Sequence, residues 1–352
     1  MKIQEASRLL GMTPRSIRYY EERGLLAPFK KENNGYRVLT NDDMERLRMI
    51  GRLRELDLPI DDIQHCLNDA MAGELSKLRP FLLRKRNALA EEYVQMRTLM
   101  KLMDHMIHAS DDMEGEQAIM ELEQVTEQAK RVRELRLNWQ DRWNFDKQAK
   151  GYDAAVNRIH GNSDVHADYE RVLQRTSGII QVKPGERGLD LGIGTGNLSA
   201  RCWEQGALMT GVDQSEEMLK QCRAKWPEFR LYLGNMMSLP LADEKFDFIM
   251  STYALHHLTE EQKCIALDEM DRVLVPGGRI AIGDLMFETE QHRNEYMIRL
   301  KKEGKFEEIT GILDEYYADR SRLLAWWEKH GYEVHAEQLG LLVHLVYARK
   351  KC

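Results

Sequence analysis

Residues 186–199 read Glu-Arg-Gly-Leu-Asp-Leu-Gly-Ile-Gly-Thr-Gly-Asn-Leu-Ser, and this stretch decides the fold of the larger part of the chain. A short apolar strand around Leu189 and Leu191 runs into a glycine loop, and the residues that follow have a helical pattern. Glycine has no Cβ, so its backbone turns tightly and lets a ligand approach closely. A glycine loop between a strand and a helix is the nucleotide site of a doubly wound α/β sheet. The loop glycines are Gly192, Gly194 and Gly196.

Further strands follow the loop in a regular order. We expect them at 208–213, 229–233, 246–251 and 279–284. The second strand ends in Asp213, where a carboxylate is placed to accept hydrogen bonds from ribose hydroxyls. Ser215 then begins a helix, because its hydroxyl is a favourable N-cap.

The spacing G-x-G-x-G after an acidic residue, with the ordered strands behind it, resembles the class I methyltransferases over about residues 140–350. The resemblance implies a Rossmann-like α/β domain with a seven-stranded sheet. It also implies S-adenosylmethionine (SAM) as cofactor and S-adenosylhomocysteine as product. Where this family usually has Asp beside the adenine, the chain has Asn235, which can still pair with the base. The cofactor contacts expected are Tyr152, Asp190, Gly192, Gly194, Gly196, Asp213, Gln214, Asn235, Met236 and Ser251.

Methyl transfer needs alignment more than acid–base chemistry, because SAM is already activated. A base is required only where the acceptor must lose a proton. The segment after the fourth strand offers His256, and the fifth strand ends in Asp284. The aromatic segment 139–153 resembles the lid of small bacterial methyltransferases and places Tyr152 near the methionine end of SAM. Catalytic roles are therefore expected for His256, Tyr152 and Asp284, although His256 and Asp284 have structural alternatives.

Composition limits the other possibilities. The chain has 352 residues, 43% of them hydrophobic, which suits more than one globular domain. We find no run of 18 apolar residues and no signal-peptide core, so we expect a cytoplasmic protein without a membrane partner. The five cysteines are scattered and form no C-x-x-C pair, so we expect neither disulfides nor a metal site.

Charge is distributed unevenly along the chain. The net charge is −7, yet residues 1–60 carry 12 Lys and Arg against 9 Asp and Glu. A basic segment at the start of an acidic chain indicates an anionic partner for that segment.

The basic segment has the sequence pattern of a DNA-binding domain. A short amphipathic helix over 3–10 ends at Gly11, and a second helix runs from Pro14 to Arg23 behind the N-cap Thr13. Two short helices joined by a tight turn form a helix-turn-helix. The side chains expected on its outer face are Arg15, Arg18 and Tyr19. A basic hairpin turn at Asn34-Gly35 follows as a wing.

Three segments, Ser16-Ile-Arg-Tyr-Tyr-Glu-Glu-Arg-Gly-Leu-Leu26, Asn34-Gly-Tyr-Arg37 and Arg52-Leu-Arg-Glu-Leu56, resemble the winged helix-turn-helix of MerR-family transcription regulators. The resemblance implies double-stranded promoter DNA as partner, action at the promoter with RNA polymerase, and a homodimer. The DNA contacts expected are Arg15, Arg18, Tyr19, Lys30, Tyr36 and Arg37. A winged helix used only for protein contact is the alternative.

A long helix is predicted over 75–107. Apolar residues recur on it at spacings of four and three, with one break near Arg86, which is the pattern of a coiled-coil seam. The seam consists of Leu82, Leu89, Tyr93, Met96, Met100, Met103 and Ile107. In the MerR family this helix pairs antiparallel with its twin, so we expect the homodimer here; packing within one chain is the alternative. Residues 110–136 are expected to form a helical connector.

The multidomain organisation expected is a DNA-binding domain at 1–72, a dimerisation helix and connector at 73–136, and a methyltransferase domain at 137–352. The first functional hypothesis is a MerR-type regulator whose methyltransferase domain methylates or senses a small molecule and couples ligand state to promoter geometry. The alternatives are a detoxifying or resistance methyltransferase with an autoregulatory DNA-binding head, and a catalytically silent sensor of SAM and S-adenosylhomocysteine. Methylation of nucleic acid is less favoured, since no N/D-P-P-Y/F motif follows the fourth strand.

Overall fold

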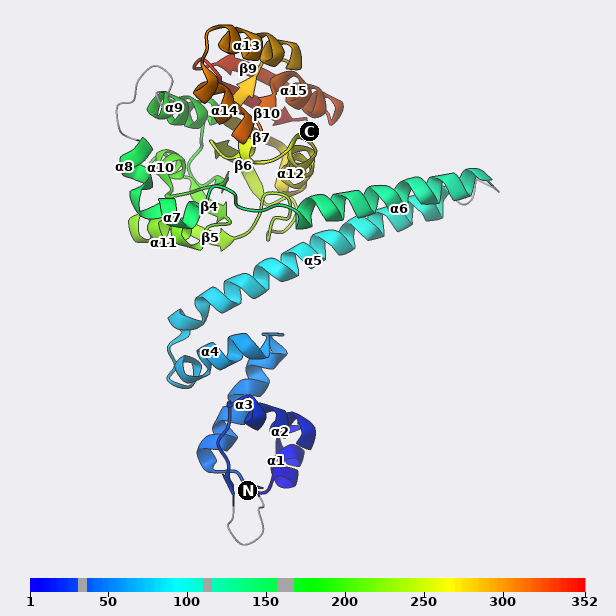
Figure 1. Cartoon of the computed structure of the whole chain (residues 1–352), viewed down its shortest axis with the longest axis vertical. Coiled ribbons are helices and arrows are strands. Elements are labelled where there is room, and N and C mark those ends of the chain that lie inside the picture. The colour runs from blue at the N-terminus through cyan, green and yellow to red at the C-terminus, as the bar shows by residue number, and fades with distance from the viewer. Residues whose placement is uncertain (31–36, 110–115, 157–167, 352) are drawn as a thin grey trace. The chain divides into compact units, whose positions relative to one another are not determined.

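The computed structural model describes residues 1–30, 37–109, 116–156 and 168–351 (Figure 1). The chain divides into two compact units, Met1–Ala88 and Leu89–Cys352, and each is described by itself. The division falls within the long helix α5 (Leu75–Ala109). In the described part of the chain, no helix combines the length and the apolar character needed to cross a membrane.

The first unit is helical with a small two-stranded sheet. Its elements are α1 (Ile3–Leu10), α2 (Pro14–Glu22), β1 (Phe29–Lys30), β2 (Arg37–Val38), α3 (Asn41–Glu55), α4 (Ile60–Met71) and the start of α5. The expected caps are present: Thr13 Oγ1 accepts from Ser16 N at 3.0 Å, and Gly11 ends α1 at φ 64°. The strands β1 and β2 pair antiparallel, while the expected turn at Asn34-Gly35 lies outside the described residues. The core is formed by Ile17, Leu47, Ile50, Leu58 and Ile63 among others.

The helices α5 and α6 (Glu116–Leu137) lie side by side in the second unit and run in opposite directions. His105 of α5 and Glu121 of α6 are 2.9 Å apart at one end of the pair. Val94 and Val125 are buried. The seven residues of the predicted seam are instead exposed, from 39% for Leu82 to 64% for Ile107. The seam face of α5 is therefore not the face that packs within the chain.

The rest of the second unit is built on a mixed sheet. Its strands are β3 (Arg187–Leu191), β4 (Leu208–Asp213), β5 (Arg230–Leu233), β6 (Phe246–Thr252), β7 (Leu274–Phe287), β8 (Ala318–Asp319), β9 (Tyr332–Gln338) and β10 (Val343–Lys350). The order is β5-β4-β3-β6-β7-β10-β9, with β8 paired to β7 as an eighth strand. Strands β3 to β7 are parallel, whereas β10 runs antiparallel to both neighbours. The Rossmann-like fold is confirmed, with seven strands along the main path and β8 added at one end of β7.

Helices cover this sheet. They are α7 (Phe145–Gln148), α8 (Tyr152–Val156), α9 (Tyr169–Ile180), α10 (Asn197–Trp203), α11 (Glu216–Lys225), α12 (Glu260–Val273), α13 (Glu290–Lys302), α14 (Phe306–Asp314) and α15 (Arg320–Lys329), with 3₁₀ turns η1 (Ala149–Gly151) and η2 (Leu255–His257). The largest core cluster joins strand residues such as Leu189 and Ile280 to Met270 of α12 and Trp327 of α15. The segment expected to interrupt the fold, 286–330, forms α13, α14, β8 and α15.

Candidate cofactor and acceptor site

The glycine loop between β3 and α10 is a left-handed turn at three positions. The φ angles are 71° at Gly192, 53° at Gly194 and 87° at Gly196. A Cβ at Gly192 would lie 2.5 Å from the Cβ of Ala254, and one at Gly196 would lie 2.7 Å from Cδ1 of Trp226. A Cβ at Gly194 would have no atom within 4 Å. Two glycines are thus required for packing within the chain, and Gly194 leaves open space.

Asp213 lies at the end of β4 beside this loop. Its carboxylate accepts from the N–H of Gly194 at 2.8 Å and from the N–H of Ser215 at 2.9 Å. Burial raises the pKa of Asp213, and these two backbone N–H groups act in the opposite direction. A carboxylate has about four acceptor positions. Backbone N–H groups, including that of Gln214, occupy part of these positions, and the carboxylate keeps acceptor capacity for a ribose hydroxyl.

A pocket opens at the carboxyl ends of β3 to β6, where ligands bind in open α/β sheets. It encloses about 670 Å³ of empty space when its open mouth is counted. Its lining is Trp139, Phe145, Tyr152, Gly192, Gly194, Val212, Asp213, Gln214, Met218, Gly234, Asn235, Met236, Thr252, Tyr253, Ala254, His257 and Leu258. The open space at Gly194, the acceptor capacity of Asp213 and the apolar side chains around Asn235 fit an adenosine group.

Some of the residues expected at the cofactor line this pocket. They are Tyr152, Gly192, Gly194, Asp213, Gln214, Asn235 and Met236. Three others lie behind the wall. Ser251 is buried and donates to the carbonyl of Leu191 at 2.8 Å. Asp190 is buried and accepts from the Ser199 hydroxyl at 2.7 Å, and Gly196 packs on α11. Ser251, Asp190 and Gly196 therefore pack against other parts of the protein and do not line the pocket. A direct contact with the cofactor is expected from the sequence at all three positions.

An aromatic group closes one side of the pocket. The rings of Tyr169 and Tyr253 stack with centroids 5.6 Å apart. Tyr253 has φ 50°, a strained conformation for a residue with a Cβ, and such strain concentrates at functional sites. Burial raises the pKa of Tyr152 well above its ordinary value, so this phenol stays protonated. The sequence offers Tyr253 as a candidate because it follows the fourth predicted strand, and the structure places it in the pocket lining.

His256 and Asp284 bind each other in the interior. His256 Nδ1 lies 2.5 Å from an Asp284 oxygen, and both side chains are buried. Asp284 also accepts from the N–H groups of Ala254 at 3.0 Å and Leu255 at 2.6 Å. Burial raises the pKa of Asp284, but His256 and the backbone N–H groups of Leu285 and Leu255 outweigh it and lower the pKa overall. Neither side chain lines the pocket, so the geometry makes them holders of the loop after β6.

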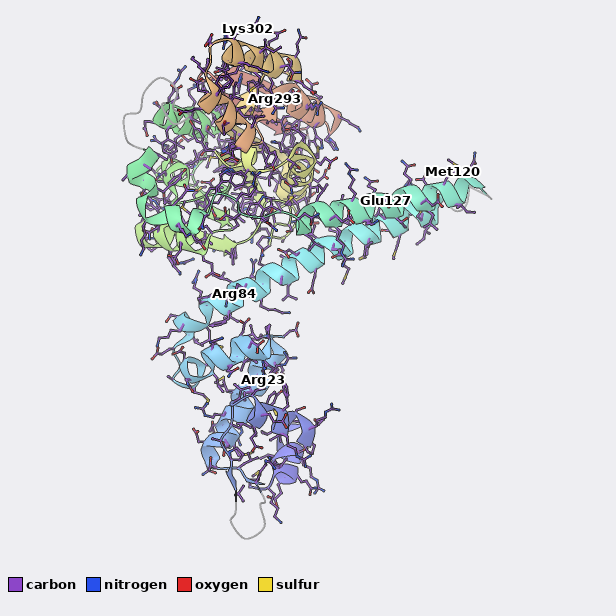
Figure 2. The ribbon with its side chains drawn as sticks, in the orientation of Figure 1. Arg23, Arg84, Met120, Glu127, Arg293 and Lys302 are labelled. Atoms are coloured by element: carbon purple, nitrogen blue, oxygen red, sulfur yellow. The ribbon has the colours of Figure 1, made fainter. Side chains whose placement is uncertain are left out.

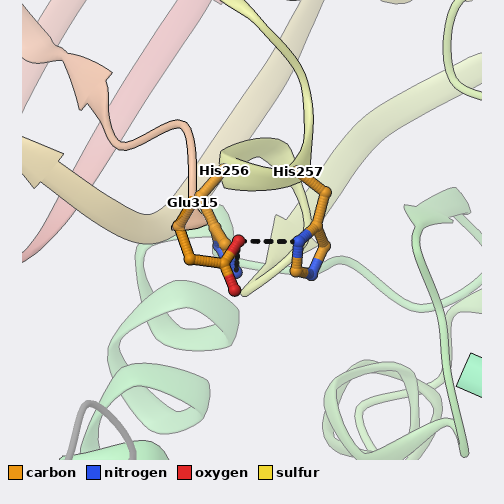
Figure 3. Close-up of side chains that lie close together, drawn as sticks. All are labelled: His256, His257 and Glu315. Carbon is orange, nitrogen blue, oxygen red and sulfur yellow. Dashed lines mark hydrogen bonds and ion pairs between the residues drawn. The ribbon is translucent and has the colours of Figure 1, made fainter. Parts of the chain in front are cut away.

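His257, the next residue, does line the pocket (Figure 3). Its ring lies 4.2 Å from the Trp143 ring and 4.9 Å from the Phe145 ring, between centroids. Its Nδ1 is 3.1 Å from Oε2 of Glu315, which precedes β8. Burial lowers the pKa of His257, so its neutral form is favoured. The sequence showed a His-His pair but gave no means to choose the second member.

The first unit presents the expected basic face on α2. Arg15, Arg18 and Tyr19 are exposed there, while Ile17 and Tyr20 are buried. Arg23, labelled in Figure 2, forms an ion pair with Asp61 near the end of the same helix.

The residues expected to form the wing are not exposed in the way that those of α2 are, or lie outside the described residues. Arg37 forms an ion pair with Glu21, so its guanidinium is held against the domain. Tyr36 and the side chain of Lys30 lie outside the described residues.

Comparison with known proteins matches both parts of the chain. Residues 1–70 match the family of MerR helix-turn-helix regulatory proteins, and residues 189–282 match a methyltransferase domain. An uncharacterized methyltransferase of Alkaliphilus oremlandii is 31% identical over 207 residues, which is 58% of this chain and 95% of the relative. One from Geobacillus kaustophilus is 30% identical over 208 residues, covering 59% and 92%. The YcgJ protein of Bacillus subtilis aligns with a TM-score of 0.43 at 17% identity, over 52% of this chain and 99% of that one.

The sequence matches agree with the pocket and with the exposed face of α2. The cofactor of the carboxy-terminal domain is SAM, and the amino-terminal domain is a DNA-binding helix-turn-helix. The chain therefore belongs to the class I SAM-dependent methyltransferases and carries a MerR-type helix-turn-helix regulatory domain ahead of the methyltransferase fold.

Proposed function

We propose that this protein transfers a methyl group from SAM to a small-molecule acceptor and that ligand occupancy of the pocket alters its binding to promoter DNA. The proposal assigns DNA binding to residues 1–72, dimerisation to 73–136 and methyl transfer to 137–352. The observation that carries it is the pocket in which the Asp213 carboxylate and the open Gly194 face the space for an adenosine.

Bound SAM supplies an electrophilic methyl carbon on a sulfonium. The residues of this chain then have to bind and orient. Asp213 accepts from the ribose hydroxyls, Asn235 and Gln214 offer amides to the adenine, and the protonated Tyr152 phenol donates near the methionine end. The Asp284–His256 pair is a positioning unit, since it fixes the backbone of the loop that carries Tyr253 and His257.

The acceptor side is assigned to the insertion between β7 and β9. The backbone N–H of Tyr316 donates to the carbonyl of His256 at 2.9 Å, so the insertion is tied to the loop after β6. Glu315 reaches His257 from the same segment. Residues of an insertion at the ligand edge of a sheet are suited to select the acceptor.

The regulatory part of the proposal depends on a homodimer formed by α5. The exposed seam from Leu82 to Ile107 is a long apolar face, and such faces mark protein interaction sites. A dimer also presents two α2 helices to the two half-sites of a palindromic operator. A change in DNA geometry would alter transcription through RNA polymerase bound at the same promoter.

Two residues suit coupling between the cofactor and the helices. Trp139 and Asn235 line the cofactor pocket and also a second cavity, formed with Glu91 of α5 and Arg133 of α6. The indole N–H of Trp139 is buried and has no hydrogen-bond partner among the described residues. A ligand that engages this ring therefore contacts a group shared with the dimerisation helices.

The first experiment is a calorimetric titration of SAM into the full chain and into Asp213→Ala. Loss of the ribose acceptor costs roughly 1–3 kcal/mol, so binding is expected to weaken about 5- to 150-fold. Asp247→Asn is the matched control, because Asp247 lies at the opposite end of the parallel strands, beside Arg187. Equal affinity in Asp213→Ala and the control contradicts the proposed site.

A second candidate is a SAM sensor without turnover. One observation favours it: His256 and Asp284, two of the groups expected to act on an acceptor, bind each other away from the pocket. Release of S-adenosylhomocysteine with a panel of acceptors distinguishes the two. A chain that binds SAM and never forms this product is a sensor.

A further inference from the structure

Three side chains with metal-binding atoms converge at the border of the pocket (Figure 3). His256 and His257 come from η2, and Glu315 comes from the segment between α14 and β8. One ligand atom from each of the three lies within 4.8 Å of the others. Glu315 Oε2 is 3.1 Å from His257 Nδ1 and 3.9 Å from His256 Nε2.

The contact with Asp284 orients the His256 ring so that its Nε2 faces Glu315. Its Nδ1 lies against the ionised Asp284, which fixes Nδ1 as the donor. In the neutral imidazole the other nitrogen is then an acceptor. His256 Nε2 thus directs a lone pair toward the Glu315 carboxylate over 3.9 Å, beyond the reach of a hydrogen bond. The space between this nitrogen and the Glu315 carboxylate can therefore hold an ion that both atoms bind.

We infer that His256, His257 and Glu315 bind one divalent transition-metal ion of the Zn²⁺ class. Two imidazoles and one carboxylate form the donor set of catalytic zinc sites, with bonds of about 2.0–2.2 Å. Such bonds place tetrahedral donors about 3.4 Å apart, and the separations from Glu315 Oε2, 3.1 and 3.9 Å, bracket this value. Asp284 behind His256 is the carboxylate that orients a metal-bound imidazole.

The charges around the cluster agree with a cation. Asp284 and Glu315 place two carboxylates in largely buried positions, with side-chain exposures of 1% and 20%. Lys263, the neighbouring buried cation, donates to Glu260 at 2.9 Å and to the carbonyls of Leu258 and Tyr316. Its charge is therefore already shared with another carboxylate, and a divalent ion balances the remaining pair.

Packing and one backbone hydrogen bond fix the positions of the two histidines. The Trp143 and Phe145 rings flank His257, and the Tyr316 N–H fixes the backbone of His256. Three protein donors leave a fourth position of a tetrahedral ion open. Since His257 also lines the cofactor pocket, the ion lies at the edge of that pocket.

The test is a titration of the full chain with ZnCl₂ after treatment with a chelator, followed by calorimetry and by competition with a chromogenic chelator. The wild type is expected to bind one Zn²⁺ per chain. Glu315→Gln and His257→Ala are expected to weaken this binding at least about tenfold, the loss that even an outer-shell partner causes. His105→Ala, which removes an exposed histidine paired with Glu121, and Cys264→Ser, which removes an exposed thiol, serve as controls. Both controls are expected to bind as the wild type does.

Substitution with Co²⁺ gives a second readout. A site of nitrogen and oxygen donors is expected to give visible bands without thiolate charge transfer, and Glu315→Gln is expected to lose them. SAM binding shows that Glu315→Gln is folded, and far-UV circular dichroism shows it for His257→Ala, because His257 lines the cofactor pocket. A chain that binds SAM but no stoichiometric Zn²⁺, or whose Zn²⁺ binding is unchanged in Glu315→Gln, overturns the metal site and leaves the proposed function standing. Zn²⁺ binding without SAM binding overturns the proposed function alone.

Discussion

The backbone N–H of Gly194 donates to Oδ2 of Asp213 at 2.8 Å and so joins the glycine loop to the end of β4. This bond fixes the carboxylate where its remaining lone pairs face the pocket. It also requires φ 53° at Gly194, where a Cβ would enter open space that a ligand needs. We therefore expect the same glycine to serve both the loop and the cofactor.

Gly194→Ala separates these two roles. The left-handed conformation costs a residue with a Cβ about 1–2 kcal/mol, so urea unfolding is expected to show a loss of this size. SAM affinity is expected to fall at least about tenfold in addition, because the methyl group occupies the ligand space. Gly304→Ala is the matched control, since Gly304 has φ 71° and equally open surroundings but does not line the pocket. If both variants bind SAM equally well, the space at Gly194 is not used by the cofactor.

Asp190 predicts an unusual dependence of stability on pH. Burial raises the pKa of this carboxyl from 3.8 to about 7. The unfolded chain loses the proton near pH 4 and the folded chain keeps it to about pH 7. The stabilisation is therefore complete below about pH 4 and is lost as the pH rises through about 7, by roughly 4 kcal/mol at 1.36 kcal/mol per pKa unit.

Asp190→Asn tests this relation, because its amide oxygen can still accept from Ser199. The variant is expected to lose less stability than the wild type between about pH 4 and pH 7, measured as the free energy of unfolding in urea. Asp247→Asn, at the start of β6, is expected to keep the wild-type slope. Equal slopes in all three proteins would mean that Asp190 is ionised in the folded chain.

The seam of α5 predicts the oligomeric state. Met100 is 59% exposed at the middle of the seam, and a charge there opposes burial against a second copy. Met100→Glu is expected to convert a dimer into a monomer in sedimentation equilibrium. Ile298→Glu changes an apolar residue of α13 with 55% exposure and is expected to leave the dimer intact. A wild type that is monomeric, or a Met100→Glu variant that remains a dimer, refutes the seam.

Arg18 on α2 predicts a phosphate contact. Each phosphate neutralised by a protein cation contributes about one to the slope of log affinity against log salt. Arg18→Ala is expected to reduce this slope by about one on random-sequence duplex DNA, measured by fluorescence anisotropy. Arg322→Ala removes an exposed arginine of α15 in the other unit and is expected to leave the slope unchanged. An unaltered slope in Arg18→Ala places the DNA on another face.

Local signals explain how much of the fold could be predicted. The strand Leu208–Asp213 was predicted with its observed bounds, because an apolar run there ends at an acid and a cap. Thr40 caps α3: its hydroxyl accepts from the N–H of Asp43, and the Asp43 carboxylate accepts from the N–H of Thr40. Sequence alone gives the boundary of a helix or strand where a capping or charged residue marks that boundary.

Sequence does not show which of two adjacent residues, His256 or His257, lines the pocket. His256 and His257 share one 3₁₀ turn, in which successive residues point about 120° apart. Only the partners, Asp284 on one side and the Trp143 ring on the other, determine which imidazole reaches the pocket. Ser251 likewise faces the Leu191 carbonyl because of the strand pairing. Such directions depend on long-range contacts that no spacing encodes.

Trp139 provides the test of coupling between cofactor and DNA. Its ring lines the cofactor pocket and also the cavity formed with residues of α5 and α6, so one side chain borders both spaces. Couplings between sites are typically about 1–3 kcal/mol, and they are reciprocal. Saturating SAM is therefore expected to change DNA affinity about 5- to 150-fold in the wild type, and DNA to change SAM affinity by the same factor. Trp139→Ala is expected to bring both factors close to one.

The control is Trp326→Ala, whose ring stacks on His330 and lies outside both linings. It removes the same side chain and is expected to retain the coupling. Both titrations are run at SAM concentrations that saturate each variant, because Trp139 also contributes to the pocket wall. If SAM changes the DNA affinity of Trp139→Ala by the same factor as in the wild type, the coupling between the two sites depends on other contacts. A wild type in which SAM leaves DNA affinity unchanged shows that the two domains act independently, since a ligand with equal affinity for both states shifts neither.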